Sequence, residues 1–365
     1  MMPAARLLTL LTGVVALFGG AGRAATPEEA SEPAASRPSL LDRLGDLAPH
    51  RVSTVAADDG TPLVVSEIDP DGDRVDLTVV GVHGFALSQR SWHFQRYGLA
   101  GDGRPRIRQV YYDHRGHGSS GAATAGTSTI EQLADDLDAV LRTVAPTGPV
   151  VLMGHSMGGM VIMELAQRNP ALFRDRVRGV ALIATAAGEV GREGVSRSLL
   201  SKYNPLTRGV GGLAGWQPGL VEFVRAAGGQ LTRPALRRLS FGSGDVPRKV
   251  VDFMIEMLAV TPVRVLVEFA DTLDRHHRYE ALAGLRHVHV LVVGAEKDRL
   301  TPISHAERIA AELPDAELAR IPGAGHMVQL EQPGLVNARL NELLRRCAGV
   351  EGMSASQRIR RWRKR

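Results

Sequence analysis

The stretch that decides the fold is residues 150–163, "VVLMGHSMGGMVIM". Two apolar runs enclose a turn in which Ser156 has a glycine two positions before it and another two positions after it. Glycine loses more conformational entropy on folding than other residues, so such a turn indicates a need for tight space or unusual dihedral angles. The pattern is that of a nucleophile elbow, a sharp strand-to-helix turn that exposes a reactive serine. An ordinary tight turn in a chain with 40 glycines is the alternative.

Short apolar runs alternate with helical stretches over most of the chain. Several runs are nearly continuous in valine, leucine and isoleucine, which is typical of strands covered on both faces. The predicted strands are residues 63–68, 77–82, 109–112, 150–153, 180–184, 288–293 and 317–321. The predicted helices are residues 130–144, 157–168, 303–313 and 336–346. The alternation predicts an α/β fold with a mostly parallel twisted sheet and helices on both of its faces.

Residues 187–280 interrupt this alternation. They contain glycine clusters and amphipathic helical stretches but no buried-strand run, which predicts a helical cap inserted into a core of residues 51–186 and 281–347. Met254 and Met257 stand on one apolar stripe of the insertion and are expected to contact substrate. Packing of these methionines within a core is the alternative.

The N-terminal residues have a composition of their own. Residues 1–24 combine Arg6, a short apolar run and small residues, which is typical of a secretory signal cleaved after Ala24. An uncleaved membrane anchor is the alternative, and either one predicts a secreted or cell-envelope protein. Residues 25–50 are rich in proline and alanine and are predicted to be a linker.

The charge of the chain is concentrated at its C-terminus. The formal net charge is +5, and six basic residues lie within 358–365, so the rest of the chain is close to neutral. This distribution argues against nucleic-acid binding. It favours contact of the basic tail, residues 348–365, with a membrane surface, for which Trp362 is a typical interfacial residue. A solvated tail without a partner is the alternative.

Cofactor and metal motifs are weak or absent in the sequence. There is no P-loop and no His-Glu-x-x-His zinc motif, and "GVGGLA" at 209–214 follows no predicted strand, as a dinucleotide-binding loop would. The single cysteine, Cys347, has no partner for an intramolecular disulfide and is expected to be a buried apolar side chain. We therefore expect no cofactor and no metal.

Two further residues complete a candidate catalytic triad with Ser156. A serine hydroxyl is a weak nucleophile until a base takes its proton, and that base needs an acid to orient it. Asp298 follows the predicted strand 288–293 and His326 follows the strand 317–321, which gives the chain order serine, acid, histidine. Because the carboxyl ends of parallel strands meet at one rim of a sheet, we expect the three side chains to lie together.

A nucleophilic serine also needs two donors for the oxyanion that develops in the transition state. The backbone N–H of Met157, directly after the serine, is one candidate, and that of Phe85, after the strand 77–82, is the other. His83 and Gly84 would let this backbone pass close to the substrate and are expected to contact it. An ordinary turn is the alternative here.

Five stretches in chain order carry a resemblance to a known family. They are "HGF" at 83–85, "DHRGHGSS" at 113–120, "GHSMGG" at 154–159, "GAEKDRLTP" at 294–302 and "GAGHMVQLEQP" at 323–333. Together they resemble the α/β-hydrolase superfamily, in particular its capped branch of esterases, lipases and peroxidase-like enzymes. The resemblance implies the fold of that family, with Ser156 as nucleophile, Asp298 as acid and His326 as base. A serine nucleophile argues against the chemistry of haloalkane dehalogenases and epoxide hydrolases, which use an aspartate.

The triad and the resemblance imply a serine hydrolase that forms an acyl-enzyme intermediate. The expected substrate is a small ester or lipid-like molecule with an apolar acyl or alcohol part. Hydrolysis of carbon–carbon or amide bonds is an alternative, because the triad does not read the leaving group. An inactive binding protein on the same fold is another, and the five intact motifs argue against it.

Overall fold

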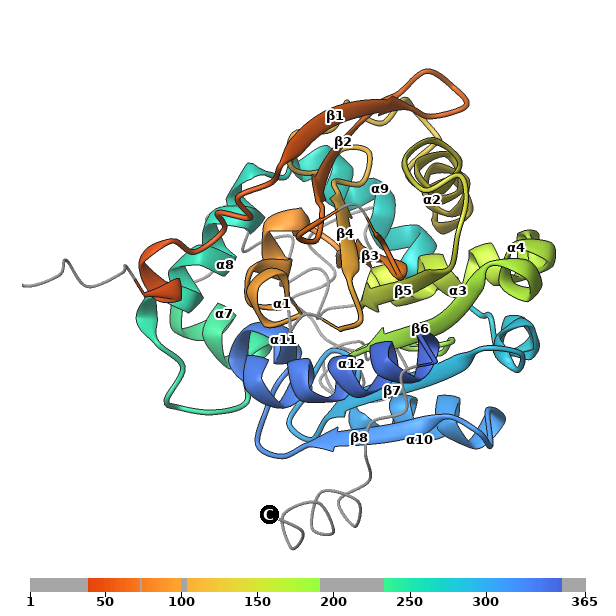
Figure 1. Ribbon diagram of the computed structural model, residues 1–365. Coiled ribbons are helices and arrows are strands. Elements are labelled where there is room, and N and C mark those ends of the chain that lie inside the picture. The colour runs from red at the N-terminus through yellow and green to blue at the C-terminus, as the bar shows by residue number, and fades with distance from the viewer. Residues whose placement is uncertain (1–38, 73, 100–103, 191–232, 350–365) are drawn as a thin grey trace, which may run out of the picture. The chain divides into compact units, whose positions relative to one another are not determined.

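Eight strands form a single sheet in the described part of the chain (Figure 1). The computed structural model describes residues 39–72, 74–99, 104–190 and 233–349. The strands are β1 (Arg51–Ala56), β2 (Pro62–Ile68), β3 (Leu77–Val82), β4 (Ile107–Tyr112), β5 (Val150–His155), β6 (Val177–Ile183), β7 (His289–Ala295) and β8 (Glu317–Ile321). Their order is β1-β2-β4-β3-β5-β6-β7-β8. The pairings of β2 with β1 and β4 are antiparallel, and all the others are parallel.

Helices cover both faces of this sheet, and each face has its own apolar core. One face is covered by α2 (Ile130–Val144), α3 (Met157–Arg168), α4 (Pro170–Asp175) and α10 (Ile303–Glu312), and the other by α1 (His93–Gly98) and α12 (Pro333–Cys347). Strand side chains alternate between the two cores, so that Val80 of β3 lies in the first and Val79 in the second. The predicted α/β fold is therefore confirmed.

The predicted strands are all present, and one strand was not predicted. β1 has a single buried side chain, Val55, while Val52 is 60% exposed. An edge strand of this kind pairs with one neighbouring strand and has only one covered face. Its sequence therefore carries no apolar run. The predicted helices 130–144 and 157–168 coincide with α2 and α3.

The structure corrects the second half of the predicted linker of residues 25–50. His93 Nε2 donates to the carbonyl oxygen of Leu40 at 2.9 Å, and Leu47 is buried in the core that α12 covers. Leucines spaced along residues 40–47 provide these contacts, whereas most of the prolines that suggested a linker precede Ser39.

Some predicted segments lie outside the described residues. They are the signal or anchor at 1–24, the first part of the linker at 25–38, the glycine-rich stretch within 191–232 and most of the basic tail, from residue 350 onward. Within the ranges that the structure describes, no helix is long and apolar enough to cross a membrane.

Three helices occupy the described part of the predicted cap, between β6 and β7 (Figure 1). They are α7 (Arg233–Ser240), α8 (Arg248–Val260) and α9 (Val263–Asp274). They contact loops at the carboxyl ends of the strands: Thr261 Oγ1 donates to the carbonyl oxygen of Ala86 at 3.4 Å, and Met327 N–H donates to that of Ser240 at 2.9 Å. These helices therefore pack on the rim where the candidate triad is expected.

A buried ion cluster fixes the loop that follows β4. Arg115 is 0% exposed and donates to Asp136 at 2.5 and 2.6 Å and to Asp59 at 2.7 Å. Burial disfavours the charged guanidinium, but its hydrogen bonds to the carboxylates of Asp136 and Asp59 outweigh that effect and raise the pKa of Arg115.

We expect Arg115→Leu to lower the free energy of unfolding by roughly 3–5 kcal/mol, because the buried carboxylate of Asp136 would lose its partner. Urea denaturation of this variant and of Arg142→Leu measures the difference. Arg142 pairs with Asp58 and Asp138, its own side chain is 55% exposed, and its loss should cost less than about 1 kcal/mol. Equal losses in the two variants would show that the buried cluster contributes no more than a surface pair.

Candidate active site

β5 ends at His155 and α3 begins at Met157, so Ser156 alone forms the turn between the strand and the helix. Its backbone has φ 51° and ψ −118°, a combination that residues other than glycine rarely adopt. Ser156 N–H donates to the carbonyl oxygen of Ile183 at 2.9 Å, and its own carbonyl oxygen accepts from Thr185 Oγ1 at 2.7 Å. Two bonds to the end of β6 and the residues directly after it thus hold the serine in a strained conformation, as a nucleophile elbow requires.

The glycines around the serine are required by the close approach of backbones. A Cβ on Gly158 would lie 2.0 Å from the carbonyl oxygen of Val82, at the end of β3. A Cβ on Gly154 would lie 2.6 Å from the carbonyl oxygen of Gly158. Backbone atoms cannot move aside as a flexible side chain can, so neither position has room for another residue. The glycine-rich turn therefore serves to seat α3 directly against the sheet.

The structure brings the three predicted triad residues together at the carboxyl ends of β5, β7 and β8. His326 Nε2 lies 3.0 Å from Ser156 Oγ, and His326 Nδ1 lies 2.9 Å from Asp298 Oδ2. With Nδ1–H donating to the carboxylate, Nε2 has a free electron pair that can accept from the serine hydroxyl. In this arrangement the imidazole is placed to take the proton of Ser156.

Asp298 is held in its ionised form by its surroundings. Its Oδ1 accepts the N–H groups of Leu300 at 2.8 Å and Thr301 at 2.9 Å, and its Oδ2 also accepts the Thr301 hydroxyl at 2.9 Å. Burial favours the neutral acid, but the charge of His326 and these hydrogen bonds together outweigh it and hold the pKa of Asp298 below its usual value. An ionised Asp298 can stabilise the imidazolium that forms when His326 accepts a proton.

The two candidate oxyanion donors come from adjacent segments. Met157 is the first residue of α3, and Phe85 lies in the loop directly after β3. A Cβ on Gly84 would lie 2.7 Å from His155 Nδ1, so this loop packs against the elbow without space for a side chain. The first N–H of a helix and an N–H from a neighbouring loop are the usual donors at such an elbow.

The sequence model of the alpha/beta hydrolase family matches residues 79–339, which include all of these groups. The chain belongs to the alpha/beta hydrolase family. The match begins in β3 and ends in α12, so it spans the sheet from the oxyanion loop to the strand that carries His326.

Relatives of this alpha/beta hydrolase have varied names. It is 28% identical over 280 residues to the dihydrolipoyllysine-residue acetyltransferase component of the acetoin cleaving system of Pseudomonas putida. That match covers 75% of this chain and 65% of the length of the relative, which is just under two thirds. It is 27% identical over 281 residues to the monoacylglycerol lipase of Mycolicibacterium smegmatis, and the match covers 74% of this chain and 87% of the lipase. The solved structure of an esterase (EaEST) from Exiguobacterium antarcticum matches with a TM-score of 0.65 at 17% identity, and the match covers 81% of this chain and 100% of the esterase. That structural likeness shows the shared fold.

The structure places the ring of His83 inside the loop after β3 of this alpha/beta hydrolase. Its ring is fully buried, Nδ1 donates to the carbonyl oxygen of Gly84 at 2.8 Å, and Nε2 accepts from His114 N–H at 3.0 Å. Both ring nitrogens therefore form hydrogen bonds with backbone groups of the two loops. Without them, these buried backbone groups would lose a hydrogen-bond partner. The ring of His83 therefore supports the loop from inside, and contact of a substrate with the backbone at His83 and Gly84 stays a prediction.

Met254 and Met257 are both buried in α8. They belong to the same apolar core as Phe85 and Met157, so the described cap and the oxyanion region share one apolar layer. Contact of these methionines with a substrate stays a prediction.

Sequence reasoning missed His155, which lies behind the triad. Its Nε2 donates to the carbonyl oxygen of His326 at 3.0 Å, and the two ring centroids are 5.0 Å apart. Burial, followed by electrostatic interaction with His326, lowers the pKa of His155 to about 3, so the ring is neutral and can fix the backbone of the candidate base. Its position beside the nucleophile was the available signal.

Sequence reasoning also missed Glu331, five residues after His326 in the last quoted motif. Its carboxylate accepts from Gly325 N–H at 2.8 Å and, across 88 residues of sequence, from Ser243 N–H at 2.7 Å. It therefore ties the loop that carries the base to the cap segment before α8. The one acidic side chain in the stretch "HMVQLEQP" was the signal for such a role.

Metal ligation finds no support among the residues that the structure describes, where no group of three or more histidine, cysteine, aspartate and glutamate side chains could hold an ion. Cys347 is only half-buried, against the core that α12 covers, and burial raises the pKa of its thiol to about 12. It therefore stays a neutral thiol near pH 7, away from the triad.

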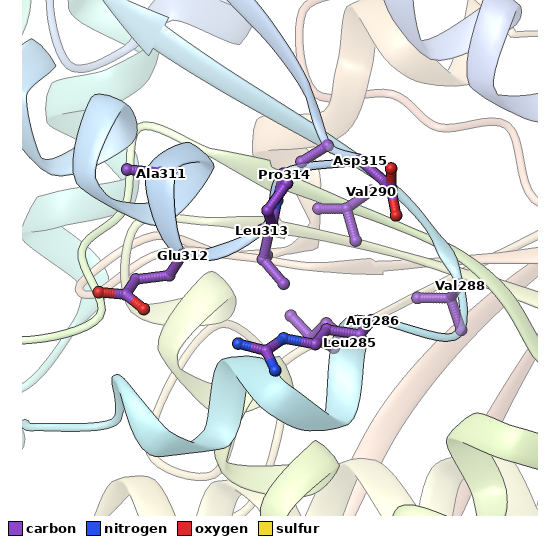
Figure 2. A pocket seen from close by; sticks show the side chains of 10 residues that line it. Leu285, Arg286, Val288, Val290, Ala311, Glu312, Leu313, Pro314 and Asp315 are labelled. Atoms are coloured by element: carbon purple, nitrogen blue, oxygen red, sulfur yellow. The ribbon is translucent and has the colours of Figure 1, made fainter.

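A groove of about 440 Å³ lies at the other end of the strands (Figure 2). Val288 and Val290 line it from the start of β7, and Leu313 and Pro314 line it from the turn before β8, with Arg286 at its rim. The triad occupies the carboxyl ends of the same strands, so this groove does not belong to the candidate active site.

Proposed function

We propose that this protein is a serine hydrolase that cleaves carboxylic esters with an apolar acyl or alcohol part. The observation that carries the proposal is the continuous pair of contacts from Ser156 Oγ through His326 to Asp298, at 3.0 and 2.9 Å. Nucleophile, base and acid at these distances are what acyl transfer through an activated serine requires.

The proposed reaction has two halves. Ser156 Oγ attacks the ester carbonyl while His326 takes its proton, and the N–H groups of Phe85 and Met157 bind the oxyanion of the tetrahedral intermediate. The intermediate then expels the alcohol, which receives that proton from His326, and leaves an acyl-enzyme. Water attacks the acyl-enzyme with His326 again as base, which releases the acid and restores the serine.

An ester with an apolar part is favoured by two observations. The apolar core that holds Phe85 and Met157 continues into the methionines of α8. A monoacylglycerol lipase and an esterase are among the proteins that the chain resembles. Export or attachment to the cell envelope, and contact of the basic tail with a membrane surface, are further parts of the proposal that rest on the sequence alone.

A panel of p-nitrophenyl esters from acetate to palmitate, with a matched p-nitroanilide, tests the function. We expect hydrolysis of the esters and labelling of the protein by a fluorophosphonate probe. Turnover of the anilide but of none of the esters would mean that the protein hydrolyses amides and not esters. Neither turnover nor labelling would overturn the serine hydrolase and favour a binding protein.

We expect Met257→Ala to raise kcat/KM for a long-chain ester, relative to acetate, by roughly 10-fold, because pocket space for each methylene group of a substrate is worth about 1 kcal/mol or more. The ratio of the two kcat/KM values measures this effect. Leu282→Ala is the matched control, since Leu282 is 1% exposed and lies in a 3₁₀-helix (Glu280–Leu285) outside the predicted cap. An unchanged ratio in Met257→Ala, or an equal change in the control, would remove this methionine from the substrate pocket.

A further inference from the structure

The loop after β3 carries the candidate donor Phe85, and hydrogen bonds fix the peptide group that contains its N–H. The carbonyl oxygen of Gly84 accepts from His83 Nδ1 at 2.8 Å and from Leu87 N–H at 3.2 Å. The C=O and N–H of a trans peptide point in opposite directions within one plane. Holding the Gly84 carbonyl by two donors therefore also sets the direction of the Phe85 N–H.

A second contact fixes the peptide group on the other side of Phe85. Ala86 N–H donates to His117 Nε2 at 3.1 Å, while His117 Nδ1 donates to the carbonyl oxygen of Arg115 at 3.0 Å. Ala86 has φ 57°, a conformation that alanine adopts at a cost and that surrounding contacts must maintain. The bond to Arg115 places the ring proton on Nδ1, so Nε2 is left as an acceptor.

The environment of His117 keeps its ring in this neutral form. The side chain is 1% exposed, and burial, followed by electrostatic interaction with the nearby His83, lowers the pKa of His117 to about 3. The Asp113 carboxylate acts in the opposite direction but does not offset these effects.

The cap holds His117 and Ala86 from the other side. The ring of Phe269 in α9 lies against His117 with centroids 5.4 Å apart, and Thr261 Oγ1 donates to the carbonyl oxygen of Ala86 at 3.4 Å. Val265 packs on the same loop, since a Cβ on Gly116 would lie 3.0 Å from it. His117 thus stands between the oxyanion loop and the described cap.

We propose that His117 is a positioning residue of the oxyanion hole, which holds the Phe85 N–H in its productive direction by accepting the N–H of Ala86. It does not touch the substrate and acts through the backbone of the loop. The proposal rests on the proposed function, because an oxyanion forms only if Ser156 attacks a carbonyl group.

Two substitutions separate the acceptor from the bulk of the ring. His117→Phe keeps a ring beside Phe269 but has no acceptor for the Ala86 N–H. In His117→Gln, the side-chain Oε1 can accept from that N–H at about the position of the histidine Nε2. We expect His117→Phe to lower kcat by about 10- to 100-fold, less than the 10²–10³ for complete loss of a donor, with KM little changed. His117→Gln should recover most of that loss.

His93→Phe is the matched control for stability. His93 is 0% exposed, so it is as buried as His117, and it donates to a backbone carbonyl, that of Leu40 near the start of the segment 39–50. We expect this variant to lose stability without losing kcat. An equal fall of kcat in His93→Phe, or no recovery in His117→Gln, would reduce His117 to a structural residue and overturn the proposal.

Two further measurements distinguish this proposal from the proposed function. A trifluoromethyl ketone that forms a tetrahedral adduct with Ser156 should bind His117→Phe more weakly by the same factor as kcat/KM falls, and undiminished binding would contradict the proposal. Hydrogen exchange of the Ala86 amide should accelerate in His117→Phe and stay slow in His117→Gln. The hydrogen-exchange measurement tests the contact between His117 and Ala86 even if the protein hydrolyses none of the esters. In that case only the proposed function fails. An Ala86 amide that is equally protected in both variants overturns the role of His117.

Discussion

Ser156→Ala is expected to lower kcat for ester hydrolysis by about 10⁴-fold or more while leaving the fold intact, as for removal of a nucleophile from a catalytic triad. The substitution deletes one oxygen atom. The bonds that hold the turn run through the backbone of Ser156 to Ile183 and Thr185, and alanine keeps both. The loss should therefore reflect chemistry and not unfolding.

Initial rates on the preferred ester and fluorophosphonate labelling measure this effect, with thermal denaturation as the check on folding. Ser91→Ala is the matched control, because Ser91 is 0% exposed and its hydroxyl has no hydrogen-bond partner among the described residues. We expect Ser91→Ala to keep kcat and Ser156→Ala to lose both turnover and labelling. Wild-type turnover in Ser156→Ala would refute the serine mechanism, whatever the substrate.

The sheet could be predicted because its strands are buried on both faces. β3 and β5 are buried at every position, and β7 is buried at every position after its first, so the sequences of these strands are apolar almost throughout. β1 alternates exposed and partly buried positions at an edge, so nothing in its composition distinguishes it from a loop. The prolines upstream of Ser39 indicate a linker, whereas the contacts of the segment 39–50 to α1 and α8 run through the carbonyl oxygen of Leu40 and the carboxylate of Asp42.

The proximity of Ser156, Asp298 and His326 could be predicted because each of them closely follows a strand of a parallel sheet, and topology then brings the strand ends together. The supporting residues could not, because they act on backbone groups that are distant in sequence. Glu331 binds the N–H of Ser243, and His155 binds the carbonyl oxygen of His326 across 171 residues. His117 likewise accepts from Ala86 only because two loops meet at one rim. Such contacts depend on loop directions, which hydrophobic periodicity does not encode.

Asp298→Asn is expected to lower kcat by about 10⁴-fold, with KM little changed. The geometry explains why an amide of the same shape should fail. Two backbone N–H groups, from Leu300 and Thr301, donate to Oδ1 at 2.8 and 2.9 Å, so the carbonyl oxygen of the new side chain should take that position. Its NH₂ group would then face His326 Nδ1 and donate to it. The imidazole would carry its proton on Nε2, which could no longer accept the proton of Ser156.

Steady-state kinetics of Asp298→Asn and of the control Asp315→Asn test this expectation. Asp315 lies in the exposed turn before β8, and its substitution should leave kcat unchanged. The double variant Ser156→Ala/Asp298→Asn gives the sharper result. Because residues that act as one unit are not additive, adding Asp298→Asn to Ser156→Ala should cost almost nothing further. A further loss of about 10²-fold or more would mean that Asp298 acts outside the relay through His326, since Ser156→Ala already removes the nucleophile that this relay activates.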